Sequence, residues 1–123
     1  MSDSGGHGDF LRKLKGSGEV TISVNGRKTG KKLSTVVWFI SDEEQNKVTI
    51  VPVNGSKTNW FKNLERNPQI ELASDGASTR ATATIVKDAD QAKRIVEELK
   101  QKYRSEWSES YYKPRDVHIE VSV

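Results

Sequence analysis

Cysteine is absent from this sequence of 123 residues, and only two histidines occur, His7 and His118. The absence of cysteine excludes disulfides, thiolate nucleophiles, iron-sulfur clusters and cysteine-ligated zinc. The two histidines supply neither a histidine metal cluster nor a Ser-His-Asp relay, and we expect His118 to be an ordinary outward-facing strand residue. An enzyme built from these residues would take its reactive centre from a bound organic cofactor, and the protein would supply binding and orientation.

Long hydrophobic runs are also missing. The longest, residues 36–40 (VVWFI), is far shorter than the ~18 residues of a membrane helix, and no signal peptide is recognisable. We therefore expect a cytoplasmic protein without membrane contact. Only 33% of the residues are hydrophobic and 30% are charged, so the core is lean and a subunit interface would supplement it. The net charge of +3 suits an anionic ligand but is low for a dedicated nucleic-acid binder.

Hydrophobic periodicity predicts one domain over residues 10–123, preceded by a polar, glycine-rich flexible tail at residues 1–9. Alternation predicts strands at residues 20–25, 33–41, 48–53, 69–74, 78–88 and 117–123. Helical spacing predicts short helices at residues 10–15 and 60–67 and a longer one that begins near Asp88 or Asp90 and ends near Tyr103. This order predicts a mainly β fold of the α+β class, with six antiparallel strands in a barrel or sheet and the helices packed outside.

The segment at residues 33–41 is β-branched and aromatic on both faces. This pattern favours a strand that is buried on two sides, so we expect it at the centre of the sheet. Pro52 cannot donate a ladder hydrogen bond, and it therefore marks an edge or the end of the next strand.

The loop NGRKTGKK at residues 25–32 places four cations, Arg27, Lys28, Lys31 and Lys32, around Thr29 and between two glycines. Inward-turned backbone N–H groups at the glycines, a hydroxyl donor and these cations would bind a phosphate. The alternative is a solvated hairpin whose charges protect a sheet edge from aggregation. Neither a Gly-x-Gly-x-x-Gly nor a Walker motif is present to decide between them.

A second candidate anion site precedes the helix at Trp60. Ser56, Lys57 and Thr58 lie where free N–H groups and the helix dipole attract anions, although Ser and Thr also cap helices without any ligand. We expect this helix start and the charged hairpin to close upon the same anion. The segment at residues 103–113 is aromatic yet polar, which indicates either a pocket wall or a loop that packs its rings on its own core.

Taken together, Gly26-Arg27-Lys28-Thr29-Gly30 after a first strand, and later Trp60, Asn63, Leu64, Asn67 and Pro68, resemble the deazaflavin-dependent nitroreductase family. The resemblance covers roughly residues 19–74. It implies a split β-barrel, usually a homodimer, within the wider group of pyridoxamine phosphate oxidase-like flavin binders. It also implies hydride transfer between a deazaflavin, coenzyme F-420, and a small organic acceptor.

The resemblance implies roles for individual residues. The substrate pocket would be lined by Tyr103 and Trp107, with Tyr111 or Tyr112 as a catalytic proton donor. By the resemblance, Arg27, Lys28 and Thr29 would bind the phosphate of the cofactor, and Trp60 and Asn63 would help to seat it. Together with the loop, strand and helix-start residues, the expected cofactor-binding residues are Arg27, Lys28, Thr29, Lys31, Lys32, Trp38, Asn54, Lys57, Asn59, Trp60 and Asn63.

Two departures from the family pattern leave the cofactor open. Lys32 and Leu33 stand where the family commonly has Pro-Arg, so a lysine would replace one guanidinium. The loop before Trp60 also lacks the usual Gly-Gly start. FMN is therefore the alternative cofactor, and a basic binding module without enzymatic activity, for example for nucleic acid, is a second alternative.

Overall fold

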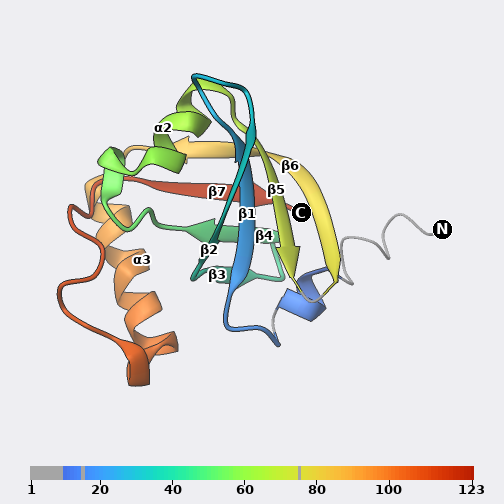
Figure 1. Ribbon diagram of the computed structural model, residues 1–123. Coiled ribbons are helices and arrows are strands. Elements are labelled where there is room, and N and C mark those ends of the chain that lie inside the picture. The colour runs from blue at the N-terminus through green and yellow to red at the C-terminus, as the bar shows by residue number, and fades with distance from the viewer. Residues whose placement is uncertain (1–9, 15, 75) are drawn as a thin grey trace.

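The computed structural model describes residues 10–14, 16–74 and 76–123. Seven strands form one antiparallel sheet in the order β2-β1-β5-β6-β7-β4-β3. Figure 1 shows how this sheet curls around its interior. The strands are β1 (Val20–Asn25), β2 (Lys32–Val37), β3 (Ile40–Asp42), β4 (Lys47–Ile50), β5 (Gln69–Ser74), β6 (Ala77–Val86) and β7 (His118–Ser122).

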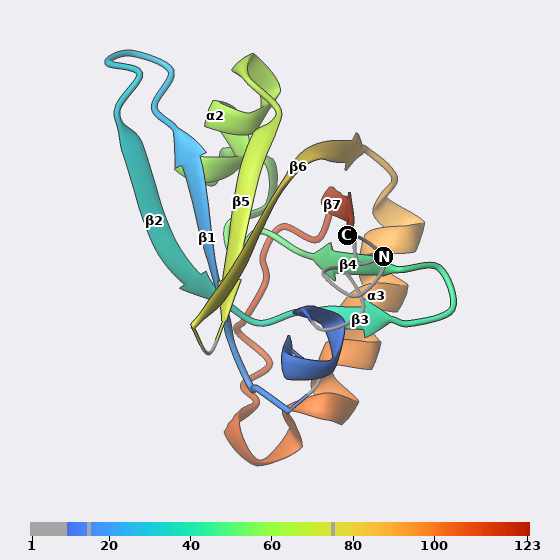
Figure 2. The same ribbon diagram turned by 90° about the vertical axis from the view of Figure 1, so that its right-hand side faces the viewer.

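The long strand β6 joins the two halves of the sheet. Its first part, from Ala77 to Thr82, pairs with β5, and its last part, from Ala83 to Val86, pairs with β7. β7 in turn is the strand to which β4 pairs. Because β6 passes from one half to the other, the sheet bends along it, as Figure 2 shows. The two edge strands, β2 and β3, are consecutive in the chain.

Helices lie at the ends and on one side of the curled sheet. The short helix α2 (Asn59–Arg66) follows the 3-10 turn η1 (Gly55–Lys57) and contacts β1. The longer helix α3 (Ala89–Lys102) begins at Asp88, whose carboxylate accepts a bond from the Gln91 N–H at 3.1 Å, and continues into the turn η2 (Arg104–Glu106). Residues 10–14 are helical as well. None of the helices in these described parts has the length and hydrophobicity to cross a membrane.

Two apolar clusters hold the fold together. The larger one fills the inside of the curl and includes Phe39, Phe61 and Leu72, all fully buried. The smaller one lies between α3 and the sheet. Its members are Val51, Val96, Leu99, Tyr103 and Tyr112, with Trp38, Ile40, Ile95 and Trp107 packed against them.

The prediction of a central, doubly buried strand at residues 33–41 is wrong. This segment is two strands, β2 and β3, and they lie at the two edges of the sheet. The chain breaks between them at Trp38 and Phe39, because Phe39 enters the larger cluster while Trp38 packs against the smaller one. Lys32 to Val36 are all exposed. β-Branched residues favour the strand conformation itself, and burial additionally requires an element that covers them.

The solvent exposure expected for His118 is also wrong. His118 does lie on the face of β7 opposite Ile119, but it is 0% exposed on that face. Its Nε2 lies 3.0 Å from Oε2 of Glu120, and Oε1 of Glu120 lies 3.4 Å from Nζ of Lys47. The sequence therefore predicted the face of His118 correctly and missed its burial.

The other predicted strands and helices occur in the structure, although the strand predicted at residues 48–53 ends at Ile50. The α+β class, mainly β, is confirmed, with seven strands in place of six because β3 was not separated from β2. The short helix α2 and the long helix α3 occur where helical spacing predicted them. The predicted flexible tail at residues 1–9 lies outside the described residues.

Candidate active site

The hairpin between β1 and β2 is closed by its own backbone. The Gly26 N–H donates to the Lys31 carbonyl and the Gly30 N–H donates to the Gly26 carbonyl, both at 2.8 Å. Thr29 Oγ1 accepts from the Lys31 N–H at 3.2 Å, and Gly30 has a φ of 73°, which glycine adopts without strain. The glycine N–H groups are therefore used within the turn and do not form the expected anion nest. The charged side chains remain as the anion-binding groups of this loop.

Arg27 joins this hairpin to α2. Its backbone N–H and its Nη1 both donate to Oδ1 of Asn63, at 3.1 and 2.8 Å. The same Nη1 lies 3.4 Å from the Asn59 carbonyl oxygen. Asn63 is only 3% exposed, so its side-chain oxygen lies on the buried side of α2, where it has little freedom to move. The hairpin and the start of the helix thus lie side by side, and Asn63 is occupied by Arg27.

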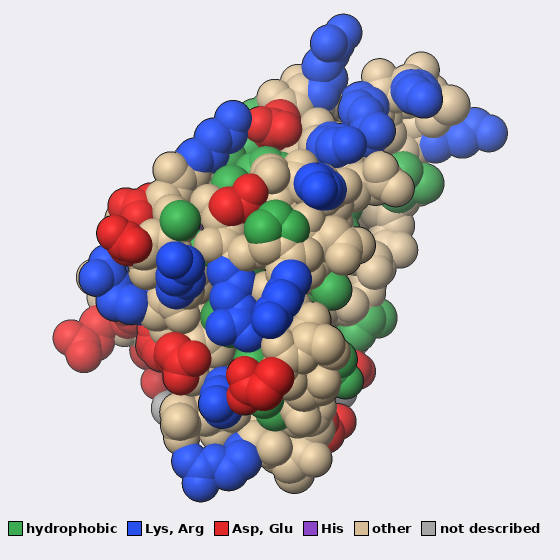
Figure 3. All heavy atoms as spheres, turned by 90° about the vertical axis from the view of Figure 1, so that its left-hand side faces the viewer, with side chains coloured by type: hydrophobic (Ala, Val, Ile, Leu, Met, Phe, Trp, Pro, Cys, Tyr) green, Lys and Arg blue, Asp and Glu red, His purple; other side chains and the backbone are tan. Residues whose placement is uncertain are grey.

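Positive charge gathers where these two segments meet. We name the exposed side chains of Arg27, Lys28, Lys31 and Lys57 the cationic rim. Lys57 belongs to it because η1 directly precedes α2, two residues before the Asn59 carbonyl that Arg27 approaches. Figure 3 shows Lys and Arg side chains crowded toward the upper end of the face that it views. The first turn of α2 contains no acidic residue, so the positive end of its dipole reinforces the rim.

Lys32 does not belong to this group. It begins β2 on the face of the strand that points away from the sheet interior, and its Nζ lies 2.6 Å from Oε1 of Glu71. This hydrogen bond from Lys32 is the largest cause that lowers the pKa of the Glu71 carboxyl below its ordinary value. Lys32 is therefore paired on the outer face, away from α2.

The turn before α2 is held by a carboxylate of the protein itself. The Ser56 N–H and hydroxyl donate to the two oxygens of Asp116, at 3.1 and 2.6 Å. The Asn54 N–H donates to Thr58 Oγ1 at 2.9 Å. A side chain at Gly55, where φ is 56°, would collide with Asp116 and Pro114. Asp116 thus occupies the donors that the sequence suggested for a ligand, and Lys57 remains exposed.

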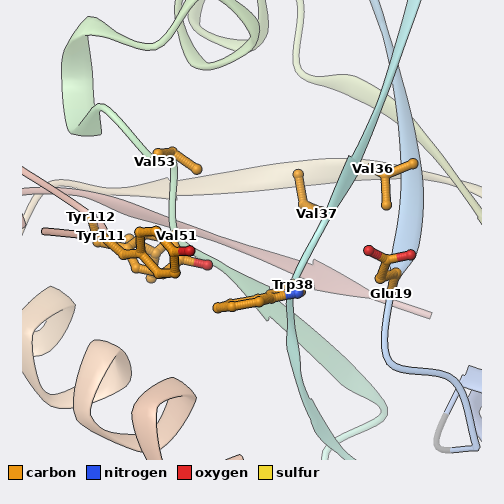
Figure 4. Close-up of a pocket in the computed structure, with 8 residues that line it drawn as sticks. All are labelled: Glu19, Val36, Val37, Trp38, Val51, Val53, Tyr111 and Tyr112. Atoms are coloured by element: carbon orange, nitrogen blue, oxygen red, sulfur yellow. The ribbon is translucent and has the colours of Figure 1, made fainter. Parts of the chain in front are cut away.

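An apolar pocket of 220 Å³ lies at the other end of β2. Three exposed residues form its open side: Val36 at 54%, Val53 at 50% and Tyr111 at 39% exposure. Figure 4 shows Trp38 in the middle, with the two tyrosines on one side of it and Glu19 on the other. The lining residues are Glu19, Val36, Val37, Trp38, Val51, Val53, Tyr111 and Tyr112.

Stacked aromatic rings fix the position of Trp38. The Tyr103 ring lies parallel to it, with centroids 4.3 Å apart and an interplanar angle of 4°. The Tyr103 hydroxyl lies 3.3 Å from both the N–H and the carbonyl oxygen of Phe39, so this second ring is anchored in turn. Tyr111 meets Trp38 edge-on at 5.7 Å, and Trp107 packs against both. Tyr103 and Trp107 therefore support the pocket from behind, and Trp38 forms its wall.

The two tyrosines that line the pocket differ in accessibility. Tyr112 is 4% exposed, and burial raises the pKa of its hydroxyl above the ordinary value. Its φ of 61° is uncommon for a bulky residue, and Arg115 holds this segment through bonds to the Tyr112 and Tyr111 carbonyls at 3.1 and 3.3 Å. Tyr111 is exposed and can meet a ligand.

A second, more polar pocket of 500 Å³ shares Trp38 and Glu19 with the first. Lys102 contributes its ammonium group there, 2.8 Å from the Phe39 carbonyl oxygen and 3.6 Å above the centre of the Phe39 ring. Loss of water around this ammonium lowers the pKa of Lys102 to about 8, although the side chain is exposed along part of its length.

The structure thus sorts the predicted residues into groups. Arg27, Lys28, Lys31 and Lys57 form the rim, with Thr29, Asn54 and Asn59 in the adjoining turns. Trp38, Tyr111 and Tyr112 line the pocket. Trp60 is partly buried against the larger apolar cluster and Asn63 is internal.

Sequence reasoning missed five lining residues: Glu19, Val36, Val37, Val51 and Val53. The valines looked like core residues because a strand pattern does not distinguish a core face from a pocket face. Pro52 could have indicated this pocket. A proline predicts the edge or the end of a strand, and apolar residues next to such a position lie near the surface.

Solved structures share the fold at low sequence identity. A conserved hypothetical protein from Mycobacterium tuberculosis matches with a TM-score of 0.71 and 17% identity, covering 100% of this chain and 81% of that one. An F420-H2 dependent reductase matches with a TM-score of 0.61 and 16% identity, covering 85% and 94%. A domain-swapped dimer matches with a TM-score of 0.61 and 16% identity, covering 93% and 98%. No curated protein sequence matches the chain.

A protein-family model decides what the fold alone leaves open. The model described as F420H(2)-dependent quinone reductase matches residues 3–123, which is almost the whole sequence. This match selects the deazaflavin over FMN as the cofactor and an oxidoreductase over a binding module. The chain therefore belongs to the F420H(2)-dependent quinone reductase family.

Proposed function

We propose that the protein reduces a small organic acceptor of the quinone class, with the acceptor and the deazaflavin ring meeting at the pocket around Trp38. The observation that carries the proposal is the connection between this pocket and the cationic rim. β2 runs from Val37 at the pocket to the hairpin, and residues 53–57 run from Val53 at the pocket to Lys57. Two segments thus link an apolar cavity to a cluster of cations.

The residues present fit a deazaflavin cofactor. Trp38, Val37 and Val53 offer the flat, apolar surface that a fused ring requires. The cationic rim and the start of α2 offer charge for the anionic tail. Along β2 the two regions are separated by roughly 16 Å at 3.3 Å per residue over five residues, which suits a ring and an anion joined by a flexible chain.

When bound, the reduced deazaflavin supplies a hydride. A quinone that accepts a hydride needs one proton more to become the hydroquinone, and the Tyr111 hydroxyl is the accessible donor at the pocket. Trp38, backed by Tyr103, orients the rings, because its own ring is held by stacking. The valines exclude water from one side of the acceptor.

The proposal includes a homodimer. Leu33 is 51% exposed and Val36 is 54% exposed on the edge strand β2, and such an apolar edge favours pairing with a second chain. One of the structural neighbours is a domain-swapped dimer. Light scattering of the purified protein measures the mass, and Leu33→Glu is expected to yield the monomer.

Titration with the oxidised deazaflavin tests the proposed function directly. We expect a saturable change in deazaflavin fluorescence at micromolar concentration for the wild-type protein. The double variant Lys28→Gln, Lys31→Gln should weaken binding about tenfold or more, because it removes two of the four rim cations. The double variant Lys93→Gln, Arg94→Gln, which removes two exposed cations on α3, is the matched control and should bind as the wild type does.

Two results would count against the proposal. Absence of saturable deazaflavin binding removes the cofactor assignment. Equal weakening by the rim variant and by the control variant, which lose the same number of charges, shows that net charge alone attracts the coenzyme, and the rim is then no specific site.

A further inference from the structure

Glu19 brings an unexpected charge to the apolar pocket. It directly precedes β1, and its side chain lines the pocket whose other seven lining residues are valine, tryptophan and tyrosine. Figure 4 shows its carboxylate on the side of Trp38 opposite the two tyrosines. The pocket is therefore polar at two ends, with hydroxyls at one end and a carboxylate at the other.

No ion-pair partner neutralises this carboxylate within the described residues. Its backbone is fixed, since Ser17 Oγ accepts from the Glu19 N–H at 3.2 Å and donates to the Glu19 carbonyl at 2.7 Å. The next residue, Val20, is 1% exposed and anchors the start of β1. The charge of Glu19 is thus held at the border between the two pockets that meet at Trp38.

The charge at this end is opposite to the charge of the cationic rim. An anionic tail is attracted to Arg27, Lys28 and Lys31 at the hairpin, whereas an anion that enters the pocket approaches Glu19. Like charges repel each other, and a carboxylate accepts hydrogen bonds from hydroxyl, amide or ammonium groups.

We propose that Glu19 is a specificity-determining residue that excludes anionic acceptors from the pocket and admits neutral ones. The inference rests on the proposed function, because it assigns the pocket to the acceptor. Glu19 takes no part in the transfer of hydride or proton.

The expected size of the effect follows from the exposure of the carboxylate. Because Glu19 is exposed, solvent screens its charge, and removal of that charge should change the affinity of an anionic acceptor about fivefold, or about 1 kcal/mol. The difference should shrink at high salt, since a concentration of 1 M shortens the screening length to about 3 Å.

Two quinones with the same ring system test the proposal: 1,4-naphthoquinone, which is neutral, and 1,4-naphthoquinone-2-sulfonate, which is anionic, and the effect of each variant is compared for each quinone separately. Their binding is measured by quenching of tryptophan fluorescence, with and without bound deazaflavin, and reduction is then followed for both. The absence of cysteine removes thiol addition as a side reaction. The variants are Glu19→Gln and the matched control Glu106→Gln, since Glu106 lines only the neighbouring pocket.

We expect Glu19→Gln to bind the sulfonate about fivefold more tightly at low salt and to bind the neutral quinone within twofold of wild type. Glu106→Gln should change neither affinity. The proposal is overturned if Glu19→Gln leaves the sulfonate affinity unchanged, if it shifts both quinones equally, or if neither quinone binds. It is also overturned if the affinity for the deazaflavin changes instead.

The same data separate this inference from the proposed function. If the deazaflavin binds and the affinity for the two quinones does not depend on the charge of residue 19, only the role of Glu19 is refuted. If the affinity for the quinones depends on the charge of residue 19 but the deazaflavin does not bind, the proposed function is refuted and the selection of acceptors by Glu19 is retained.

Discussion

Replacement of Asn63 by alanine should loosen the cationic hairpin from α2. In the wild type, Oδ1 of Asn63 accepts from the N–H and from Nη1 of Arg27, at 3.1 and 2.8 Å. A hydrogen bond to a charged group contributes about 1.5 to 3 kcal/mol and a neutral one about 1 kcal/mol. Arg27 is exposed, so water replaces much of both bonds in the variant.

We therefore expect Asn63→Ala to lower the free energy of unfolding by about 1.5 kcal/mol, or the melting temperature by roughly 4 to 8 °C for a chain of this length. The freed hairpin must be ordered again when the deazaflavin binds, so its dissociation constant should rise about tenfold. Thermal unfolding and deazaflavin fluorescence measure the two effects on the same sample.

The matched control is Asn67→Ala at the other end of α2, where Oδ1 of Asn67 accepts from the Gln69 N–H at 3.2 Å. This variant should lose some stability and keep its affinity for the deazaflavin. Loss of stability without loss of affinity in Asn63→Ala would refute the reasoning, because the hairpin would then be ordered without its anchor. A double-mutant cycle with Arg27→Ala should give a coupling of about 1 kcal/mol.

Three further predictions concern the neighbourhood of the pocket and the sheet. Gly55→Ala should lower the free energy of unfolding by more than about 2 kcal/mol, measured by denaturant titration, because φ is 56° and a Cβ would meet Asp116. Tyr111→Phe should lower kcat roughly 100-fold with little change in the deazaflavin dissociation constant, since it removes only the proton donor. The hydrogen bond from His118 is the largest cause that lowers the pKa of the Glu120 carboxyl below 4.5, so the stabilisation by Glu120 is present above pH 4.5 and is lost as the pH falls through the lowered value. Glu120→Gln should therefore flatten the dependence of the melting temperature on pH below 4.5, and an unchanged slope would contradict this account.

The sequence pattern predicted a helix or strand well where its apolar residues all lie on one face of that element. The helical stripe of Ala92, Val96 and Leu99 and the alternation of Ile119 and Val121 specify a buried face directly, and all five are buried. In both cases these residues follow the period that the sequence shows, and that period predicted their burial. Such elements are readable from the chain alone.

Tertiary arrangement decided the cases that the sequence did not reveal. Val36 and Val53 are apolar, yet they line an open pocket, because no described element covers the end of β2. His118 is polar and belongs to the face of β7 that the alternation predicts to point outward, yet it is 0% exposed. Which strand becomes an edge depends on pairings between distant segments, and single-sequence periodicity contains no information on them.

The cation-rich loop illustrates a third kind of limit. Its charges were visible in the sequence, but the partner of each charge was not. Arg27 is bound to Asn63 and Lys32 to Glu71, and these two contacts divide one run of cations between two faces of the molecule. An estimate of ligand affinity from composition counts Arg27 and Lys32 alike, whereas in the structure only Arg27 lies beside α2.

The place of β7 between β6 and β4 has a consequence for synthesis on the ribosome. β3 and β4 emerge early, but they join the other strands only through β7, which is made last of the seven. Until then this early hairpin has an unpaired edge that another nascent chain can capture. Rapid release of the finished polypeptide, or a chaperone that shields residues 40–50 in the meantime, should therefore govern how much protein reaches the native state.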